Sequence, residues 1–214
     1  MPGPGRRAIA LQFYHVPDGC CSARRGAVGI RANSAADIAA IKMVVSLPVI
    51  GILKRDYPDS KVFITATMLE VHEIMQSQPD MIALDATDRP RPNGESLSAL
   101  VAAVREQYPQ VLLMADVATV DEAKNAERLK FDCVSSTLFG YTAATAGHLL
   151  PDDDFAQLRA MRAVIRCPLI AEGNVDTPER AAQALKAGAD AVVVGGAITR
   201  PQLITRRFAS ALSM

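Results

Sequence analysis

Strand-length apolar runs alternate with amphipathic stretches along most of this chain, and no other feature constrains its fold as much. Seven such runs occupy residues 27–32, 49–55, 81–86, 111–117, 133–140, 168–174 and 191–197, and a further candidate strand covers 8–15. Strands that are apolar on both faces and separated by helices pair in parallel beneath a layer of helices. A count of eight favours a single-domain α/β protein of the (β/α)8 or TIM-barrel type over an open doubly wound sheet.

The stretches between the strands carry helix-start signals. These signals lie at Ser34, Gly94-Glu95, Thr119, Asp152 and Thr177-Pro178. Pro178 would occupy the first helical turn, where its missing N–H is not needed, and Gly188 would supply the left-handed residue that ends the same helix. The sequence therefore predicts a helix after each of the five signals.

The first β/α unit differs from the others. Only ten residues, 16–25, separate the candidate strand at 8–15 from the next unit, and Pro17 and Gly19 are among them. A parallel crossover needs a dozen or more residues. We therefore expect a divergent segment at 1–25 and a barrel domain at 26–214. The first unit would then either return irregularly or leave the barrel open at an exposed strand edge.

The charge balance argues against nucleic acid and anionic membranes as binding partners of this protein. The chain has 23 basic and 23 acidic residues and a pI near 6.8, so it lacks a basic field for nucleic acid or an anionic membrane. The segment 133–151 contains no Lys, Arg, Asp or Glu, but its serines and threonines make it too polar for a membrane span. Gln12, Tyr14 and His15 interrupt a faint resemblance to a secretion signal, so we expect a cytoplasmic protein.

Charged residues stand near the ends of several predicted strands, on the face that their apolar neighbours share. Reading each strand with a period of two places five of them on one rim of the barrel: Arg31, Lys54, Asp85, Asp116 and Glu172. Reacting groups of such barrels come from the carboxyl ends of the strands. For any one of these residues a solvated loop anchor is an equal alternative. Asp85 could cap the loop toward Thr87, with Arg31 as its structural partner.

The ends of the last two predicted strands are rich in glycine. Gly195-Gly196 precedes a helical segment, and two glycines let backbone N–H groups approach an anion closely. Barrels frequently bind phosphate with the loops after strands seven and eight, so Gly173-Asn174 and Arg200 would complete the site. Close packing of a strand against a helix is the alternative reason for Gly-Gly.

Metal ligands are not grouped in the sequence. The three histidines, His15, His72 and His148, share no strand end, and Asp85 with Asp116 does not make a persuasive metal site. We therefore expect no metal.

Seven long motifs give the chain a family resemblance. They are GAVGIRANS at 26–34, VIGILKRDYPDS at 49–60, IALDATDRPRP at 82–92, LLMADVAT at 112–119, TLFGYT at 137–142, IAEGN at 170–174 and VVVGGAITRP at 192–201. These motifs resemble those of the N-acetylmannosamine-6-phosphate 2-epimerases. The resemblance implies a (β/α)8 barrel that interconverts N-acetylmannosamine 6-phosphate and N-acetylglucosamine 6-phosphate in sialic acid catabolism, without a metal or an organic cofactor.

The resemblance also implies roles for individual residues. Lys54 would be the catalytic acid/base and Glu172 the second catalytic group. A lysine acts as a base near neutral pH only where burial or nearby cations lower its pKa from ~10.4, and Arg31 would be such a cation. Arg31 would also stabilise the enolate. Asp116 would orient the lysine or bind a sugar hydroxyl of the substrate, and Asp85 would contact the substrate. The phosphate residues would be Gly173, Asn174, Gly195, Gly196 and Arg200. Related barrels commonly pair, so we expect a homodimer.

Three departures from the family pattern leave other hypotheses open. The family begins with a strand ending in Ser-Cys-Gln, which this chain lacks, Asn174 replaces the usual Arg, and Phe139 replaces a Ser. A non-catalytic or decayed sugar-phosphate-binding barrel is therefore the main alternative. A phosphate-binding lyase or synthase is a third, which the combination of Lys54 with Glu172 disfavours.

Overall fold

The computed structural model describes residues 8–13 and 23–212 as a closed barrel of parallel strands in the order β1 to β8. The strands are β1 (Ala8–Phe13), β2 (Gly29–Asn33), β3 (Val49–Ile52), β4 (Met81–Asp85), β5 (Leu112–Asp116), β6 (Cys133–Ser135), β7 (Leu169–Glu172) and β8 (Ala191–Val194). The predicted (β/α)8 fold is thus confirmed.

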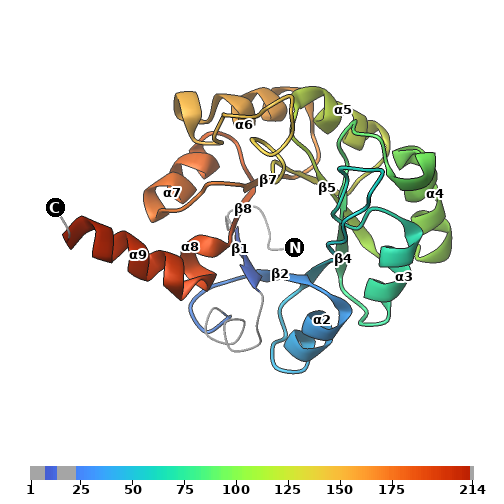
Figure 1. Cartoon of the computed structure of the whole chain (residues 1–214), viewed down its shortest axis with the longest axis horizontal. Coiled ribbons are helices and arrows are strands. Elements are labelled where there is room, and N and C mark those ends of the chain that lie inside the picture. The colour runs from blue at the N-terminus through green and yellow to red at the C-terminus, as the bar shows by residue number, and fades with distance from the viewer. Residues whose placement is uncertain (1–7, 14–22, 213–214) are drawn as a thin grey trace.

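Helices surround the strands (Figure 1). They are α2 (Ala35–Lys42), α3 (Met68–Met75), α4 (Leu97–Gln107), α5 (Val120–Arg128), α6 (Asp152–Val164), α7 (Pro178–Lys186), α8 (Gly196–Thr199) and α9 (Pro201–Leu212), with a 3-10 turn at Pro92–Gly94. The core between helices and sheet is almost entirely aliphatic. Among the described residues, none of the helices combines the length and apolar character that crossing a bilayer requires.

The first strand closes the barrel. β1 pairs with β2 from Ala10 opposite Gly29 onward, and with β8 from Ala8 opposite Ala191 onward. Of the two alternatives for the first unit, the open barrel edge is therefore wrong. Because β1 belongs to the sheet, the barrel also begins before residue 26, the predicted start of the domain. The predicted irregular return to β2 falls largely on residues 14–22, outside the described part of the chain.

Most of the predicted helix starts are confirmed. The side chains of Ser34, Thr119 and Thr177 cap α2, α5 and α7, each accepting a hydrogen bond from a backbone N–H in the first turn. The predicted start at Gly94-Glu95 is wrong, because those residues lie in and just after the 3-10 turn and Ser96 caps α4. Gly188 has φ +112°, the left-handed conformation expected after α7.

Several strands end earlier than predicted, and β3, β6 and β8 differ most from the prediction. β6 stops at Ser135 rather than at residue 140, since the next hydroxyls bind other strands: Ser136 Oγ donates to the carbonyl of Glu172 at 2.9 Å and Thr137 Oγ1 donates to Asp116 at 2.7 Å. β8 stops at Val194, and Gly196 already begins α8. The segments that follow β6 and β8 therefore lie at the carboxyl ends of the strands, where both contribute to the cavity described below.

Candidate active site

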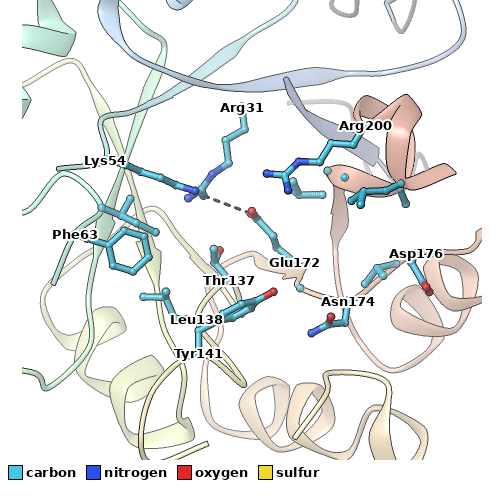
Figure 2. Close-up of a pocket in the computed structure, with 18 residues that line it drawn as sticks. Arg31, Lys54, Phe63, Thr137, Leu138, Tyr141, Glu172, Asn174, Asp176 and Arg200 are labelled. Carbon is cyan, nitrogen blue, oxygen red and sulfur yellow. Dashed lines mark ion pairs between the residues drawn. The ribbon is translucent and has the colours of Figure 1, made fainter. Parts of the chain in front are cut away.

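A cavity of about 520 Å³ lies at the carboxyl ends of the strands (Figure 2). Eight of the ten predicted site residues line it: Arg31, Lys54, Glu172, Gly173, Asn174, Gly195, Gly196 and Arg200. They come from β2, β7 and the segments after β3, β7 and β8. Asp85 and Asp116 do not line the cavity. Sequence reasoning missed the apolar wall formed by Phe63, Leu138 and Tyr141.

Arg31 forms the buried floor of the site. Its guanidinium is fully buried and binds Asp116 through both nitrogens, Nη1 to Oδ1 at 2.9 Å and Nη2 to Oδ2 at 2.5 Å. Nη1 also lies 3.4 Å from Glu172 Oε2, the ion pair drawn in Figure 2. Such a two-pronged pair fixes the plane of the guanidinium. Asp116 therefore aims Arg31 at the carboxylate of Glu172 from beneath the cavity.

Glu172 lies at the end of β7 with its carboxyl group in the cavity but only 9% of its side chain exposed. Among the described residues, Oε2 has no hydrogen-bond partner. Burial raises the pKa of Glu172 above its usual range; Arg31 opposes this shift and Asp116 adds to it. The carboxyl group therefore keeps its proton to a higher pH than an ordinary glutamate does.

We expect Asp116→Asn to lower the pKa of Glu172. The substitution removes a negative charge that holds this pKa up, and it frees Arg31 to interact more strongly with Glu172, so both effects have the same sign. An NMR titration of the Glu172 carboxyl carbon in both proteins measures the change. An unchanged or higher pKa in the variant would contradict this account of the site's electrostatics.

Lys54 is exposed and follows β3 on a loop that folds back on itself. Its backbone N–H donates to Asn33 Oδ1 at 2.9 Å, and it bridges to Ile64. Figure 2 shows its side chain directed toward the space beside Arg31 and Glu172. Its Nζ lies 6.0 Å from the centre of the Phe63 ring. Lys54 is therefore not one of the buried groups of the site.

A buried carboxylate braces the loop that carries Lys54. Glu70 of α3 is fully buried, and its Oε1 accepts hydrogen bonds from Arg55 and Tyr57, both at 2.6 Å. Burial alone would raise the pKa of Glu70, but the hydrogen bonds from Tyr57 and Thr67 outweigh it and the pKa is lowered. Arg55 also pairs with Glu73 of the same helix at 2.8 Å.

Asp85 anchors a loop. Its carboxylate is fully buried at the end of β4, where it accepts a hydrogen bond from Thr87 Oγ1 at 2.7 Å and pairs with Arg89 at 2.6 Å. Burial raises the pKa of Asp85, and Arg89 opposes the shift. This arrangement matches the loop-capping alternative, although the partner is Arg89 and not Arg31.

The glycine-rich loops lie at the other side of the cavity. Gly173 and Asn174 follow β7 with φ of +110° and +55°, and Gly195 immediately precedes α8. Figure 2 shows Asn174 and Arg200 on the opposite side of Glu172 from Phe63. Within the described residues, no three His, Cys, Asp or Glu side chains are grouped so as to hold a metal ion.

Comparisons with known proteins, by sequence and by structure, indicate the same family. A family model described as "Putative N-acetylmannosamine-6-phosphate epimerase" matches residues 19–214. A protein from Enterobacter sp. (strain 638) is 62% identical over 89% of this chain and 81% of its own, and one from Shouchella clausii is 60% identical over 87% and 82%. Both are named "Putative N-acetylmannosamine-6-phosphate 2-epimerase".

Solved structures extend the comparison. The N-acetylmannosamine-6-phosphate 2-epimerase of Clostridium perfringens has a TM-score of 0.89 and 41% identity, covering 95% of this chain and 93% of that one. A thiamine phosphate pyrophosphorylase from Pyrococcus furiosus, at 15% identity and a TM-score of 0.62, shares the fold alone, covering 89% and 86%. With a family match over nearly its whole length and relatives above half identity, the chain belongs to the N-acetylmannosamine-6-phosphate epimerase family.

Proposed function

We propose that this protein interconverts N-acetylmannosamine 6-phosphate and N-acetylglucosamine 6-phosphate by removing and returning the proton at C2, without a metal or an organic cofactor. The observation that carries the proposal is that Lys54 and Glu172, an ammonium and a carboxyl group, face one cavity beside the buried guanidinium of Arg31. Family membership supports the choice of substrate.

The chemistry needs two proton carriers and one cation. Once the sugar ring opens, the hydrogen at C2 lies next to the C1 aldehyde, and its removal leaves an enolate. One of Lys54 and Glu172 takes this proton, and the other delivers a proton to the opposite face of C2, which inverts the configuration. Arg31 stabilises the negative enolate oxygen. The net proton count of substrate and product is unchanged.

The remaining residues hold the substrate or the machinery. Gly173, Asn174, Gly195, Gly196 and Arg200 bind the 6-phosphate at the far side of the cavity. Asp116 acts on the reaction by positioning Arg31, and Asp85 by fixing the loop after β4. The assignment of Asp116 and Asp85 as positioning residues rests on their absence from the cavity lining and on the partners that occupy their carboxylates.

In heavy water, we expect the product to carry deuterium at C2. An enolate mechanism exchanges this hydrogen with groups that equilibrate with solvent, whereas a route that keeps the C2–H bond does not. Proton NMR of N-acetylglucosamine 6-phosphate formed from N-acetylmannosamine 6-phosphate measures the loss of the C2 signal. Conversion with full retention of hydrogen would refute the enolate, and calorimetric binding without turnover would favour the non-catalytic alternative.

We also propose a homodimer, supported by the exposed apolar surface of α9. None of its residues is buried, and Phe208 and Leu212 are 70% and 86% exposed one turn apart on the same side. Figure 1 shows α9 extending away from the barrel. Light scattering should give twice the chain mass of 22.8 kDa, and Phe208→Asp should shift it toward the monomer. A monomeric wild-type protein would contradict this.

We propose a cytoplasmic location for the enzyme. Cys133 is buried and Cys167 half-buried, and both are free thiols, as a reducing compartment would keep them. The balanced charge likewise supports a small anionic substrate rather than nucleic acid.

A further inference from the structure

The hydroxyl of Thr137 lies among the charged groups of the active site, and the proposed reaction assigns it no role. Thr137 follows β6, is half-buried and lines the cavity. Its Oγ1 lies 2.7 Å from Asp116 Oδ1 and 2.8 Å from Ser135 Oγ. Figure 2 shows its oxygen directed toward the pair formed by Arg31 and Glu172. Thr137 therefore binds the carboxylate that positions Arg31 and stands close to the second proton carrier.

The single hydrogen of the Thr137 hydroxyl fixes the direction of these hydrogen bonds. The Asp116 carboxylate, paired with Arg31, can only accept, so Thr137 donates its hydrogen to Asp116. The hydroxyl of Ser135, which is fully buried, then donates to Thr137. Asp116 also accepts two hydrogen bonds from Arg31, so it keeps both of these when the Thr137 hydrogen turns away. Rotation about one C–O bond is enough to redirect that hydrogen.

Glu172 is the group that attracts this hydrogen once it is ionised. Burial raises the pKa of Glu172 and Asp116 adds to the shift, whereas Arg31, a hydrogen bond from Thr137 and Lys54 oppose it. Asp116 lies beneath the cavity on β5, and the other titratable or charged side chains that share the cavity with Glu172 are Arg31 of β2, Lys54 after β3, Tyr141 after β6, Asp176 after β7 and Arg200 after α8. Among the groups that act on Glu172, Thr137 is uncharged, and its hydrogen can follow the charge of the carboxyl group.

We propose that Thr137 is a positioning residue whose hydroxyl hydrogen turns from Asp116 to Glu172 when Glu172 loses its proton, and so stabilises this carboxylate as a proton acceptor inside the barrel. When Glu172 is protonated, the hydrogen returns to Asp116 and the carboxyl group delivers its proton to C2. The step exchanges one hydrogen bond for another and breaks no covalent bond. The proposal rests on the proposed epimerase function and deepens it with a residue that acts through Glu172.

The test is the pH dependence of kcat/KM in the wild type, Thr137→Val and Thr137→Ser. Whichever of Lys54 and Glu172 takes the C2 proton, the working pair holds one proton in total, so the acidic limb reports the more acidic group, Glu172. Without the hydroxyl the pKa of Glu172 rises, and the limb moves to higher pH. We expect Thr137→Val to lose about tenfold in kcat/KM on this limb, as for one hydrogen bond to a charged group, and little on the plateau. Serine keeps the hydroxyl and should restore the wild-type profile.

Thr142→Val is the matched control. Thr142 lies in the same loop, its buried hydroxyl bonds that of Thr145, and it does not line the active-site cavity. This variant should leave the acidic limb where it is. An equal loss at every pH in Thr137→Val would indicate a direct contact with the substrate, and an unmoved limb would show that the hydroxyl does not serve Glu172. Either result would overturn the proposal.

An NMR titration of the Glu172 carboxyl carbon separates this proposal from the epimerase function, because it needs no substrate. We expect the pKa of Glu172 to be higher in Thr137→Val than in the wild type, and unchanged in Thr137→Ser and Thr142→Val. Lack of turnover of N-acetylmannosamine 6-phosphate would contradict the epimerase function, and the titration would still decide the role of Thr137. An unchanged or lower pKa in Thr137→Val would reject that role even in an active enzyme.

Discussion

Replacing Lys54 by Met lowers kcat by about 10²–10⁴-fold, the contribution of a positioned proton carrier. Methionine keeps the length and the apolar stem of the side chain but cannot hold a proton. Because Lys54 is exposed, its side chain contributes little to the core, and the variant should unfold at the same temperature as the wild type. A coupled assay for N-acetylglucosamine 6-phosphate, together with a thermal melt, measures both quantities.

Two further variants distinguish the loss of proton transfer by Lys54 from the loss of its positive charge. Lys54→Arg keeps the positive charge, but a guanidinium does not give up its proton at neutral pH. If the reaction requires proton transfer by residue 54, this variant should be as inactive as Lys54→Met. Lys186→Met, which removes an exposed lysine in the last turn of α7, is the matched control and should keep full activity. A fully active Lys54→Met would remove this residue from the mechanism.

Asp116→Ala destabilises the fold by about 3–5 kcal/mol, the loss typical of breaking a buried ion pair. Arg31 and Asp116 are both fully buried, and their bidentate contact joins β2 to β5 across the barrel interior. Removal of the carboxylate leaves the guanidinium without its main counter-charge in a medium that solvates it poorly. Urea unfolding followed by circular dichroism measures the free energy of unfolding.

An exposed pair provides the comparison. Asp121 pairs with Lys124 at 2.8 Å, but its side chain is 83% exposed, so Asp121→Ala should change the free energy of unfolding by about 1 kcal/mol or less. Nearly equal losses for the two variants would show that burial of the Arg31 pair does not contribute to stability as argued.

The alternation of apolar runs and helices predicts the barrel because it reflects the burial of both faces of each strand. The same signal places the ends of β6 and β8 too late. Leu138 lies in the loop after β6 and is buried, so the apolar pattern continues where the strand has already ended. Apolar character reports burial, and it does not report whether the backbone is still paired with a neighbouring strand.

Strand periodicity predicts which face a side chain takes but not which partner it finds. Lys54, Glu172 and Asp85 all follow from the same reading, yet only the first two line the cavity, since a nearby arginine in the sequence turns Asp85 toward its own loop. Glu70 illustrates the converse. Its capping box with Thr67 is visible in the sequence, but its contacts with Arg55 and Tyr57 exist only once the loop after β3 folds over α3.

The unequal burial of Lys54 and Glu172 has a consequence for isotope labelling. An ammonium group open to solvent trades its hydrogens with water rapidly, whereas a sheltered carboxyl group holds the hydrogen it has taken long enough to give it back. Under the proposed function, unreacted starting sugar should therefore pick up solvent label when Lys54 removes its proton, and remain unlabelled when Glu172 does. The epimer that becomes labelled before conversion identifies the face of C2 that the lysine serves.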